Sequence, residues 1–180
     1  MNDNKADWVE IRVRVKAFLE QKIYPAEPVL HGADRTAANL KLANLMDQAK
    51  EAGLWALGHP IEIGGQGLPF MEYVYINEVI GRSEHAQKVF GTLTHQDSIM
   101  LNEYASPKWK QEYLAPLVSG ELYPSFAMTE PDVASSDATN ITTIIQRDGD
   151  DYIINGSKTF ITNGQHCDVV IVAARTNKDV

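Results

Sequence analysis

The chain has 180 residues, 44% hydrophobic and 22% charged, which is enough to bury one core and part of a second. A net charge of −8 repels phosphate backbones and argues against nucleic-acid binding. The single cysteine, Cys167, excludes an intrachain disulfide and favours a reducing, cytoplasmic compartment. The N-terminus is polar, unlike a secretory signal, and the longest apolar run, residues 169–174, is too short to cross a membrane.

The first part of the chain has apolar residues at helical spacing. Residues 8–19 predict a helix that Pro25 and Pro28 end. Asp34 is the expected N-cap of a second helix, and Gly53 lies where its C-cap belongs.

A glycine-rich, irregular connection is expected at residues 54–69, followed by three more helices. The first begins near Phe70, and the others cover residues 85–104 and 107–118. The helix that begins near Phe70 is expected to bury Met71, Val74, Tyr75 and Val79.

After Gly120 the apolar period changes from about four residues to two, which is typical of strands. The turn at residues 148–151 predicts a hairpin. Strands are expected at residues 123–128, 141–147, 152–155, 158–162 and 169–174, and the last of these is expected to be buried. We therefore expect an α+β protein: an all-α helical domain at residues 1–121, then the first part of an antiparallel β-barrel or sandwich at residues 122–180, incomplete because the chain stops after its last strand.

The segment 123–140 has the most informative chemistry. An apolar strand ends at Thr129, and Pro131 blocks further pairing and directs the chain into a loop rich in Ser, Asp and Thr. Its hydroxyls and freed backbone N–H groups suit a ligand with carbonyls and phosphates. The alternative is a solvated connection whose Ser and Asp side chains cap its own backbone.

Five segments occur in an order and spacing typical of one enzyme family. They are residues 54–68 (LWALGHPIEIGGQGL), 78–81 (EVIG), 114–121 (LAPLVSGE), 126–137 (FAMTEPDVASSD) and 155–164 (NGSKTFITNG). Through them the chain resembles the acyl-CoA dehydrogenase family from about residue 35 to residue 175. The resemblance implies FAD-dependent α,β-dehydrogenation of an acyl-CoA thioester in fatty acid β-oxidation. It also implies a homodimer or homotetramer that passes electrons to an electron-transferring flavoprotein.

The same resemblance assigns residues to the flavin site. Met128 and Thr129 would meet the pyrimidine edge of the flavin through backbone and hydroxyl groups. Thr162 would bond near the hydride-accepting nitrogen, and Phe126 and Phe160 would pack against the ring system, with Phe160 standing where tryptophan is usual in the family.

Three further residues complete the assigned binding set. Ile161 belongs to the same flavin-contacting segment as its two neighbours. The loop after Pro131 is one residue longer than the family's commonest form, so either Ser135 or Ser136 could reach the ligand. We favour Ser136, beside the flavin pyrophosphate and the acyl-CoA.

No catalytic base is assigned within residues 1–180, because the family's catalytic carboxylate lies in a C-terminal helical domain. Glu130 and Glu78 are expected to serve in turns or salt bridges. An alternative to the enzyme is a non-catalytic binding or assembly subunit of the same fold.

Other kinds of site are disfavoured. Residues 64–67 lack the ending of a phosphate-binding loop, and no G-x-S-x-G elbow supports a hydrolase. The five histidines are scattered, so no metal site is expected, and His95 is predicted to cap or pack.

Overall fold

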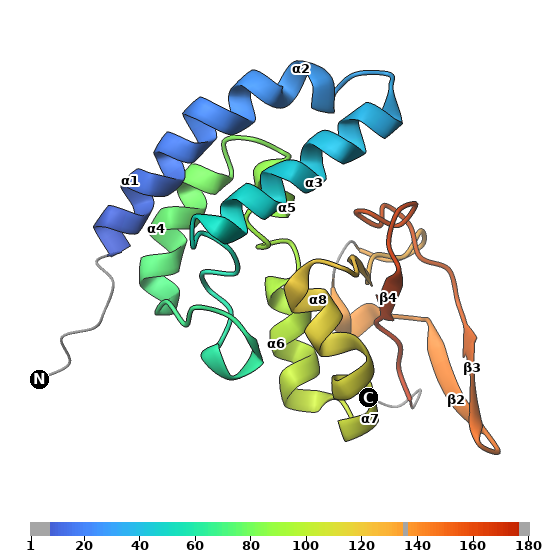
Figure 1. Cartoon of the computed structure of the whole chain (residues 1–180). Coiled ribbons are helices and arrows are strands. Elements are labelled where there is room, and N and C mark those ends of the chain that lie inside the picture. The colour runs from blue at the N-terminus through green and yellow to red at the C-terminus, as the bar shows by residue number, and fades with distance from the viewer. Residues whose placement is uncertain (1–7, 135–136, 177–180) are drawn as a thin grey trace, which may run out of the picture. The chain divides into compact units, whose positions relative to one another are not determined.

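A computed structural model of the chain describes residues 8–134 and 137–176. It contains two compact units, Met1–Glu121 and Leu122–Val180, called here the helical unit and the strand unit (Figure 1). The expected order of helices followed by strands is confirmed, and the described strands form no closed barrel. Within the described residues, no helix is both long enough and apolar enough to cross a bilayer.

The helical unit begins with one continuous helical segment. Helix α1 (Trp8–Phe18) continues through a π turn (Leu19–Ile23) and a 3-10 turn (Tyr24–Ala26) into α2 (Glu27–Leu30). The expectation that Pro25 and Pro28 end this helix is therefore wrong. Both prolines occupy the first turn of a short helical piece, where the missing N–H costs no hydrogen bond.

Helix α3 (Arg35–Glu51) has the ends that the sequence predicts. The Asp34 carboxylate accepts a hydrogen bond from the Ala37 N–H at 3.0 Å, which satisfies one of the free donors of the first turn. Gly53 follows the helix with a φ of 63°, and its N–H donates to the Lys50 carbonyl at 2.9 Å.

The remaining helices follow a 3-10 turn at Ile61–Ile63. They are α4 (Phe70–Ile80), α5 (Ala86–Val89), α6 (His95–Tyr104), α7 (Pro107–Trp109), a π turn (Lys110–Leu114) and α8 (Ala115–Ser119). The single helix expected over residues 85–104 is wrong, because the chain breaks between α5 and α6. Gly91 there has a φ of 68°, and the Phe90 carbonyl accepts a hydrogen bond from the Ala56 N–H at 2.9 Å.

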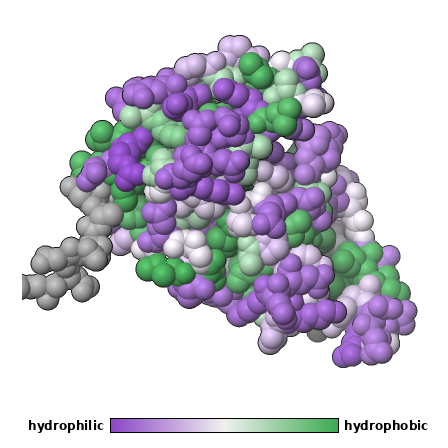
Figure 2. All heavy atoms as spheres, viewed as in Figure 1, coloured by the Kyte–Doolittle hydropathy of each residue, from purple (hydrophilic) through white to green (hydrophobic). Residues whose placement is uncertain are grey.

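Helix α4 presents a different face to the core from the one predicted. Tyr73, Ile76, Val79 and Ile80 are buried, so only Val79 of the predicted set is correct. Met71, Val74 and Tyr75 are 60%, 39% and 53% exposed. The helix is apolar on several sides, so packing against α1, not the sequence pattern, decides which side is covered. Figure 2 shows apolar residues interspersed with polar ones on the viewed surface.

Trp55 organises a second, smaller cluster with Ala56, Leu114 and Val118. Its indole N–H donates to the Val118 carbonyl at 2.9 Å. Gly91 and Gly120 approach the ring so closely that a Cβ on either would lie 2.6 Å or 2.7 Å from it. The tryptophan therefore requires glycine at both positions.

Substituting Gly120 tests this packing. Gly120→Ala should lower the free energy of unfolding by about 3 kcal/mol, because the residue has a φ of 79° and the new methyl group would overlap Trp55. Gly53→Ala is the matched control in the same unit, since its φ of 63° is similar but its nearest atom is 3.9 Å away. That control should cost only about 1 kcal/mol. The free energy of unfolding is measured by urea unfolding followed by tryptophan fluorescence. Equal losses in the two variants would contradict the role given to Trp55.

The strand unit contains two pairs of strands. Strands β2 (Ile144–Asp148) and β3 (Asp151–Asn155) form the predicted antiparallel hairpin, with Gly149 at a φ of 62° in the turn. Strands β1 (Pro124–Ala127) and β4 (Val169–Val172) pair in parallel, so the expectation of antiparallel pairing is wrong for them. The long connection between these two strands allows the crossover that a parallel pair requires.

Strand β4 was expected to be buried, but Val170 is 47% exposed and the other three residues are half-buried. The apolar run alone did not show how many faces of this strand would be covered. Ile144 forms an isolated parallel bridge with Arg175, which joins the beginning of β2 to the chain after β4.

Candidate functional site

Strand β1 and the chain just after it lie beside residues 158–163, which run in the opposite direction. The Thr159 N–H donates to the Thr129 carbonyl at 3.0 Å. Further along, the buried Ser125 hydroxyl donates to the Thr162 carbonyl at 2.6 Å. The two segments that the sequence assigns to one ligand are therefore neighbours.

Residues 158–162 were expected to form a strand, and this is wrong, since the segment has no regular secondary structure. Phe160 and Asn163 have φ angles of 54° and 63°, a left-handed conformation that interrupts a regular ladder. The Asn163 side chain instead donates to the Pro124 carbonyl at 3.2 Å. Side-chain bonds thus replace ladder bonds along part of this pairing.

A buried carboxylate fixes the end of β1. Glu130 is 4% exposed and accepts hydrogen bonds from the Thr142 and Thr143 N–H groups, both at 2.8 Å, and from the Thr142 hydroxyl. Lys158 Nζ lies 2.9 Å from the same carboxylate and 2.8 Å from the Met128 carbonyl oxygen. Burial raises the pKa of Glu130, but the hydrogen bonds from the two threonines and Lys158 outweigh it and hold the pKa well below its ordinary value.

The expected salt-bridge role of Glu130 is thus confirmed. Glu78, the other carboxylate considered, pairs with Arg12 at 2.6 Å and with Arg82, also as expected. Both carboxylates are held by basic partners.

Neutralising Glu130 should destabilise the strand unit. Glu130→Gln leaves the Lys158 charge without its partner, which should cost about 3 kcal/mol of unfolding free energy at pH 7. The pKa of Glu130 is lower in the folded state than in the unfolded state. Its contribution to the free energy of unfolding is therefore present above the unfolded pKa of about 4.3 and is lost as the pH falls below that value. Asp150→Asn, at an exposed turn residue of the same unit, is the control and should change stability by less than about 0.5 kcal/mol. If urea unfolding gives an equally small change in the free energy of unfolding for Glu130→Gln, the ion pair of Glu130 with Lys158 is not stabilising.

The predicted ligand residues lie in different environments along this edge. Phe126 is half-buried in β1, paired with Ile171. Phe160 is 92% exposed, and Thr162 is exposed beside it. The remaining described members are half-buried: Met128, Thr129 and Ile161.

The loop after Pro131 is described only in part. Ser135 and Ser136 lie outside the described residues. Asp137 accepts hydrogen bonds from the Thr139 N–H at 3.0 Å and from the Asn140 amide at 2.6 Å, and it caps the 3-10 turn Ala138–Asn140. At Asp137 the loop therefore caps its own backbone, as the alternative interpretation of this segment expects.

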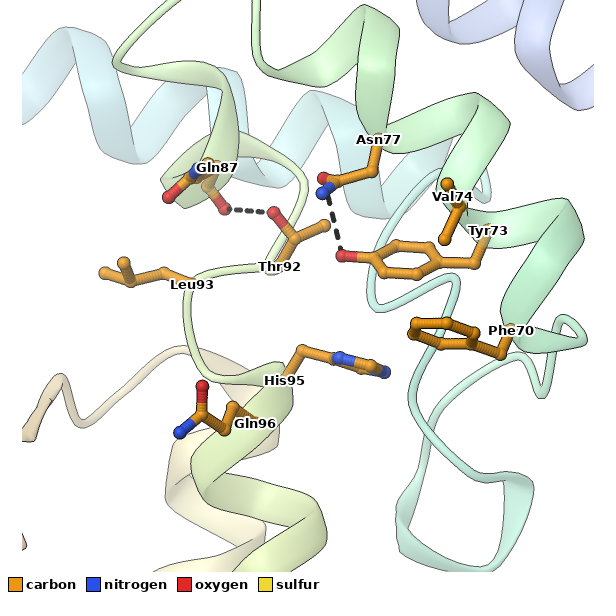
Figure 3. Close-up of a pocket in the computed structure, with 9 residues that line it drawn as sticks. All are labelled: Phe70, Tyr73, Val74, Asn77, Gln87, Thr92, Leu93, His95 and Gln96. Carbon is orange, nitrogen blue, oxygen red and sulfur yellow. Dashed lines mark hydrogen bonds between the residues drawn. The ribbon is translucent and has the colours of Figure 1, made fainter. Parts of the chain in front are cut away.

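The helical unit has a pocket of its own, with a cavity volume of about 340 Å³. His95 Nε2 lies 2.9 Å from the Gly58 carbonyl oxygen, and the His95 ring packs on Tyr73 with centroids 4.8 Å apart (Figure 3). The predicted packing role of His95 is thus confirmed. The residues that line the pocket come from α4, α5, α6 and the chain before α6: Phe70, Tyr73, Val74, Asn77, Gln87, Thr92, Leu93, His95 and Gln96.

Of these lining residues, only His95 was singled out from the sequence, and its predicted role was to cap or pack. Phe70 and Val74 were assigned to the helix but not to a pocket. One sequence feature could have indicated a pocket here. Helix α4 has more apolar residues than a single buried face can accommodate, so some of them must line another surface.

Next to His95, with ring centroids 5.1 Å apart, His59 is fully buried, and its Nε2 lies 3.2 Å from the Thr94 hydroxyl. Burial and the neighbouring His95 ring lower the pKa of His59 to about 4. The ring is therefore neutral at pH 7.

Acid should destabilise the helical unit through His59. The unfolded chain binds this proton near pH 6.5 and the folded chain only near pH 4, so stability is complete above pH 6.5 and falls below it. Lowering the pH from 7 to 5 should cost about 2 kcal/mol. His59→Asn should remove this part of the pH dependence, while His166→Asn, at an exposed histidine, should keep it. Urea unfolding at several pH values measures how the free energy of unfolding changes with pH in each variant. The same pH dependence in both variants would refute the assignment to His59.

Two sequence profiles match the chain. The one described as "Acyl-CoA dehydrogenase, N-terminal domain" covers residues 6–121, and the one described as "Acyl-CoA dehydrogenase, middle domain" covers residues 125–180. The chain belongs to the acyl-CoA dehydrogenase family.

Individual members of the family match most of the chain. Human acyl-CoA dehydrogenase family member 11 is 37% identical over 179 residues, which cover 93% of this chain and 23% of the human protein. The crystal structure of acyl-CoA dehydrogenase from Geobacillus kaustophilus has a TM-score of 0.68 and 30% identity, covering 99% of this chain and 46% of that one. A glutaryl-CoA dehydrogenase from Mycobacterium smegmatis in complex with FADH2 has a TM-score of 0.71 and 26% identity, covering 95% of this chain and 43% of that one. The chain thus spans less than half the length of each of these family members.

Proposed function

We propose that the chain is the N-terminal helical domain and part of the middle domain of an FAD-dependent acyl-CoA dehydrogenase. The observation that supports this best is the pairing of the β1 exit with residues 158–163, because it brings together two segments that the family resemblance assigns to one flavin. The similar structure of the Mycobacterium smegmatis glutaryl-CoA dehydrogenase in complex with FADH2 supports the choice of cofactor.

The polar groups at this edge fit a flavin. The carbonyl oxygens of Ala127, Met128 and Thr129 already accept hydrogen bonds from Ala173, Lys158 and Thr159. The groups that residues 127–129 can present to a ligand are therefore N–H donors and the Thr129 hydroxyl. A reduced flavin has negative charge on its pyrimidine side, and fixed donors stabilise such a charge without reorganising.

Phe160 fits the flat face of the same ligand. An aromatic ring that is 92% exposed gains nothing from a core, and its left-handed φ of 54° costs conformational energy. Such strain is common at ligand sites, where the bound molecule covers the exposed ring. Thr162 and Ile161 follow in the same segment, within reach of the same ligand.

When bound, FAD supplies the acceptor for the hydride that leaves the β-carbon of the acyl thioester. In this proposal the chain's own residues bind and orient the cofactor, and Ser136 stands beside the pyrophosphate and the acyl-CoA. Glu130 is engaged by Lys158 and two threonines, so it is unsuited to remove the α-proton, and we assign the catalytic base to residues outside this chain.

We assign the pocket of the helical unit to the acyl chain. Phe70 and Val74 supply an apolar wall on one side of the pocket, next to the Asn77 amide, and Leu93 and Gln87 lie on the opposite side (Figure 3). Homodimer or homotetramer formation, an electron-transferring flavoprotein as acceptor and a place in fatty acid β-oxidation belong to the same proposal.

The reaction is tested by mixing the complete, flavin-loaded protein with a panel of acyl-CoA thioesters of different lengths under anaerobic conditions. Loss of the oxidised-flavin absorbance with at least one thioester is the expected result. Tight acyl-CoA binding with the flavin still oxidised would instead favour the non-catalytic binding subunit of the same fold.

Phe160→Gly should separate ligand binding from stability. Flavin affinity of the complete protein should fall about tenfold, because a ring contact worth about 1.4 kcal/mol is lost. Stability of the flavin-free protein should stay the same or rise by about 1 kcal/mol, since glycine accepts the left-handed conformation. Tyr152→Ala removes another exposed ring, on β3, and should leave flavin affinity unchanged. Equal flavin dissociation constants for Phe160→Gly and the unsubstituted protein, measured by fluorescence quenching, would remove Phe160 from the site.

A further inference from the structure

Two histidines and one glutamate of the helical unit converge at the C-terminal end of α2. His31 follows that helix, and Glu84 and His85 immediately precede α5. His31 Nδ1 lies 3.2 Å from a Glu84 carboxylate oxygen, and His85 Nε2 lies 3.4 Å from the same oxygen. The two imidazole rings stand edge to face with centroids 4.7 Å apart.

These distances fit a metal ion as well as a salt bridge. Zinc lies about 2.0–2.1 Å from histidine nitrogens and carboxylate oxygens, so neighbouring ligand atoms of a tetrahedral site are about 3.4 Å apart. Two of the three pairs already have this spacing, and all three ligand atoms lie within 4.8 Å of one another. Only a small side-chain movement would bring the third pair to the same separation.

The donor atoms are also chemically suitable. His85 Nε2 is buried, and no described residue forms a hydrogen bond with it. An imidazole nitrogen that has no hydrogen-bond partner can offer its lone pair to an ion. Glu27 adds a second negative charge nearby, opposed by Lys88.

We propose that His31, Glu84 and His85 form a binding site for a divalent transition-metal ion, with zinc the ion that two imidazoles and one carboxylate suit best. Glu84 and His31 are exposed, so water can complete the coordination. The ion would join the end of α2 to the chain before α5, two segments far apart in sequence. This proposal is independent of the flavin site, because all three ligands belong to the helical unit.

The test is a calorimetric titration of the complete, tag-free protein with zinc chloride. We expect one site that His31→Ala and His85→Gln each weaken by more than the roughly 10–100-fold that loss of an outer partner costs. Cobalt(II) should give the visible absorption bands of a four-coordinate ion in the unsubstituted protein, and these bands should be lost in both variants.

His166→Ala is the matched control, since it removes an exposed histidine of the strand unit and should leave the titration unchanged. His31 is 52% exposed at its side chain, so His31→Ala should fold normally, which circular dichroism checks. Zinc affinity that is the same in His31→Ala as in the unsubstituted protein would overturn the proposal. So would the absence of saturable binding up to about 1 mM zinc.

Discussion

The buried charge of Glu130 is the constraint on which the strand unit depends. A carboxylate that is only 4% exposed is tolerated when donors surround it, and here they come from two other segments, Thr142 with Thr143 and Lys158. One side chain therefore fixes three stretches of chain that are separate in sequence. Because Lys158 also binds the Met128 carbonyl, the same ion pair fixes the backbone just after β1.

This arrangement explains how an irregular segment can form a defined edge. Residues 158–163 lack ladder pairing, yet Thr159, Thr162 and Asn163 each bond to the β1 segment. Phe160 can therefore remain in a left-handed conformation with its ring in solvent, because the residues on both sides of it are held. A strained backbone conformation of this kind, held in place by the hydrogen bonds around it, is expected where a protein binds a ligand.

The helical unit shows a different kind of constraint, since close approach and burial, not charge, fix its irregular connection. Trp55 sits against Gly91 and Gly120, which leave no room for a Cβ, and His59 is buried neutral against Thr94. These contacts hold the chain before α4 and the break between α5 and α6. The pocket beside His95 is lined from the same region, so its shape depends on packing within this unit.

The sequence by itself determined the features that depend on a few neighbouring residues. The Asp34 cap, the left-handed Gly53 and the Gly149 turn follow from local dihedral angles and hydrogen bonds, and each occurs where it was predicted. The change from helices to strands after Gly120 followed from apolar period, and the family followed from short motifs whose residues are close together in the chain. The candidate ligand residues of this edge, such as Thr129 and Thr162, come from the same motifs, and their contact with a flavin stays a prediction.

Only the tertiary structure decided the features that join distant segments. It set which face of α4 is covered, the break at Gly91, the parallel pairing of β1 with β4, and the meeting of His31 with His85. Each of these depends on which surfaces pack together, and a residue's own preference contributes little to that choice when several faces are apolar. Local backbone rules act within about one turn of chain, whereas burial and close approach are properties of the whole folded unit.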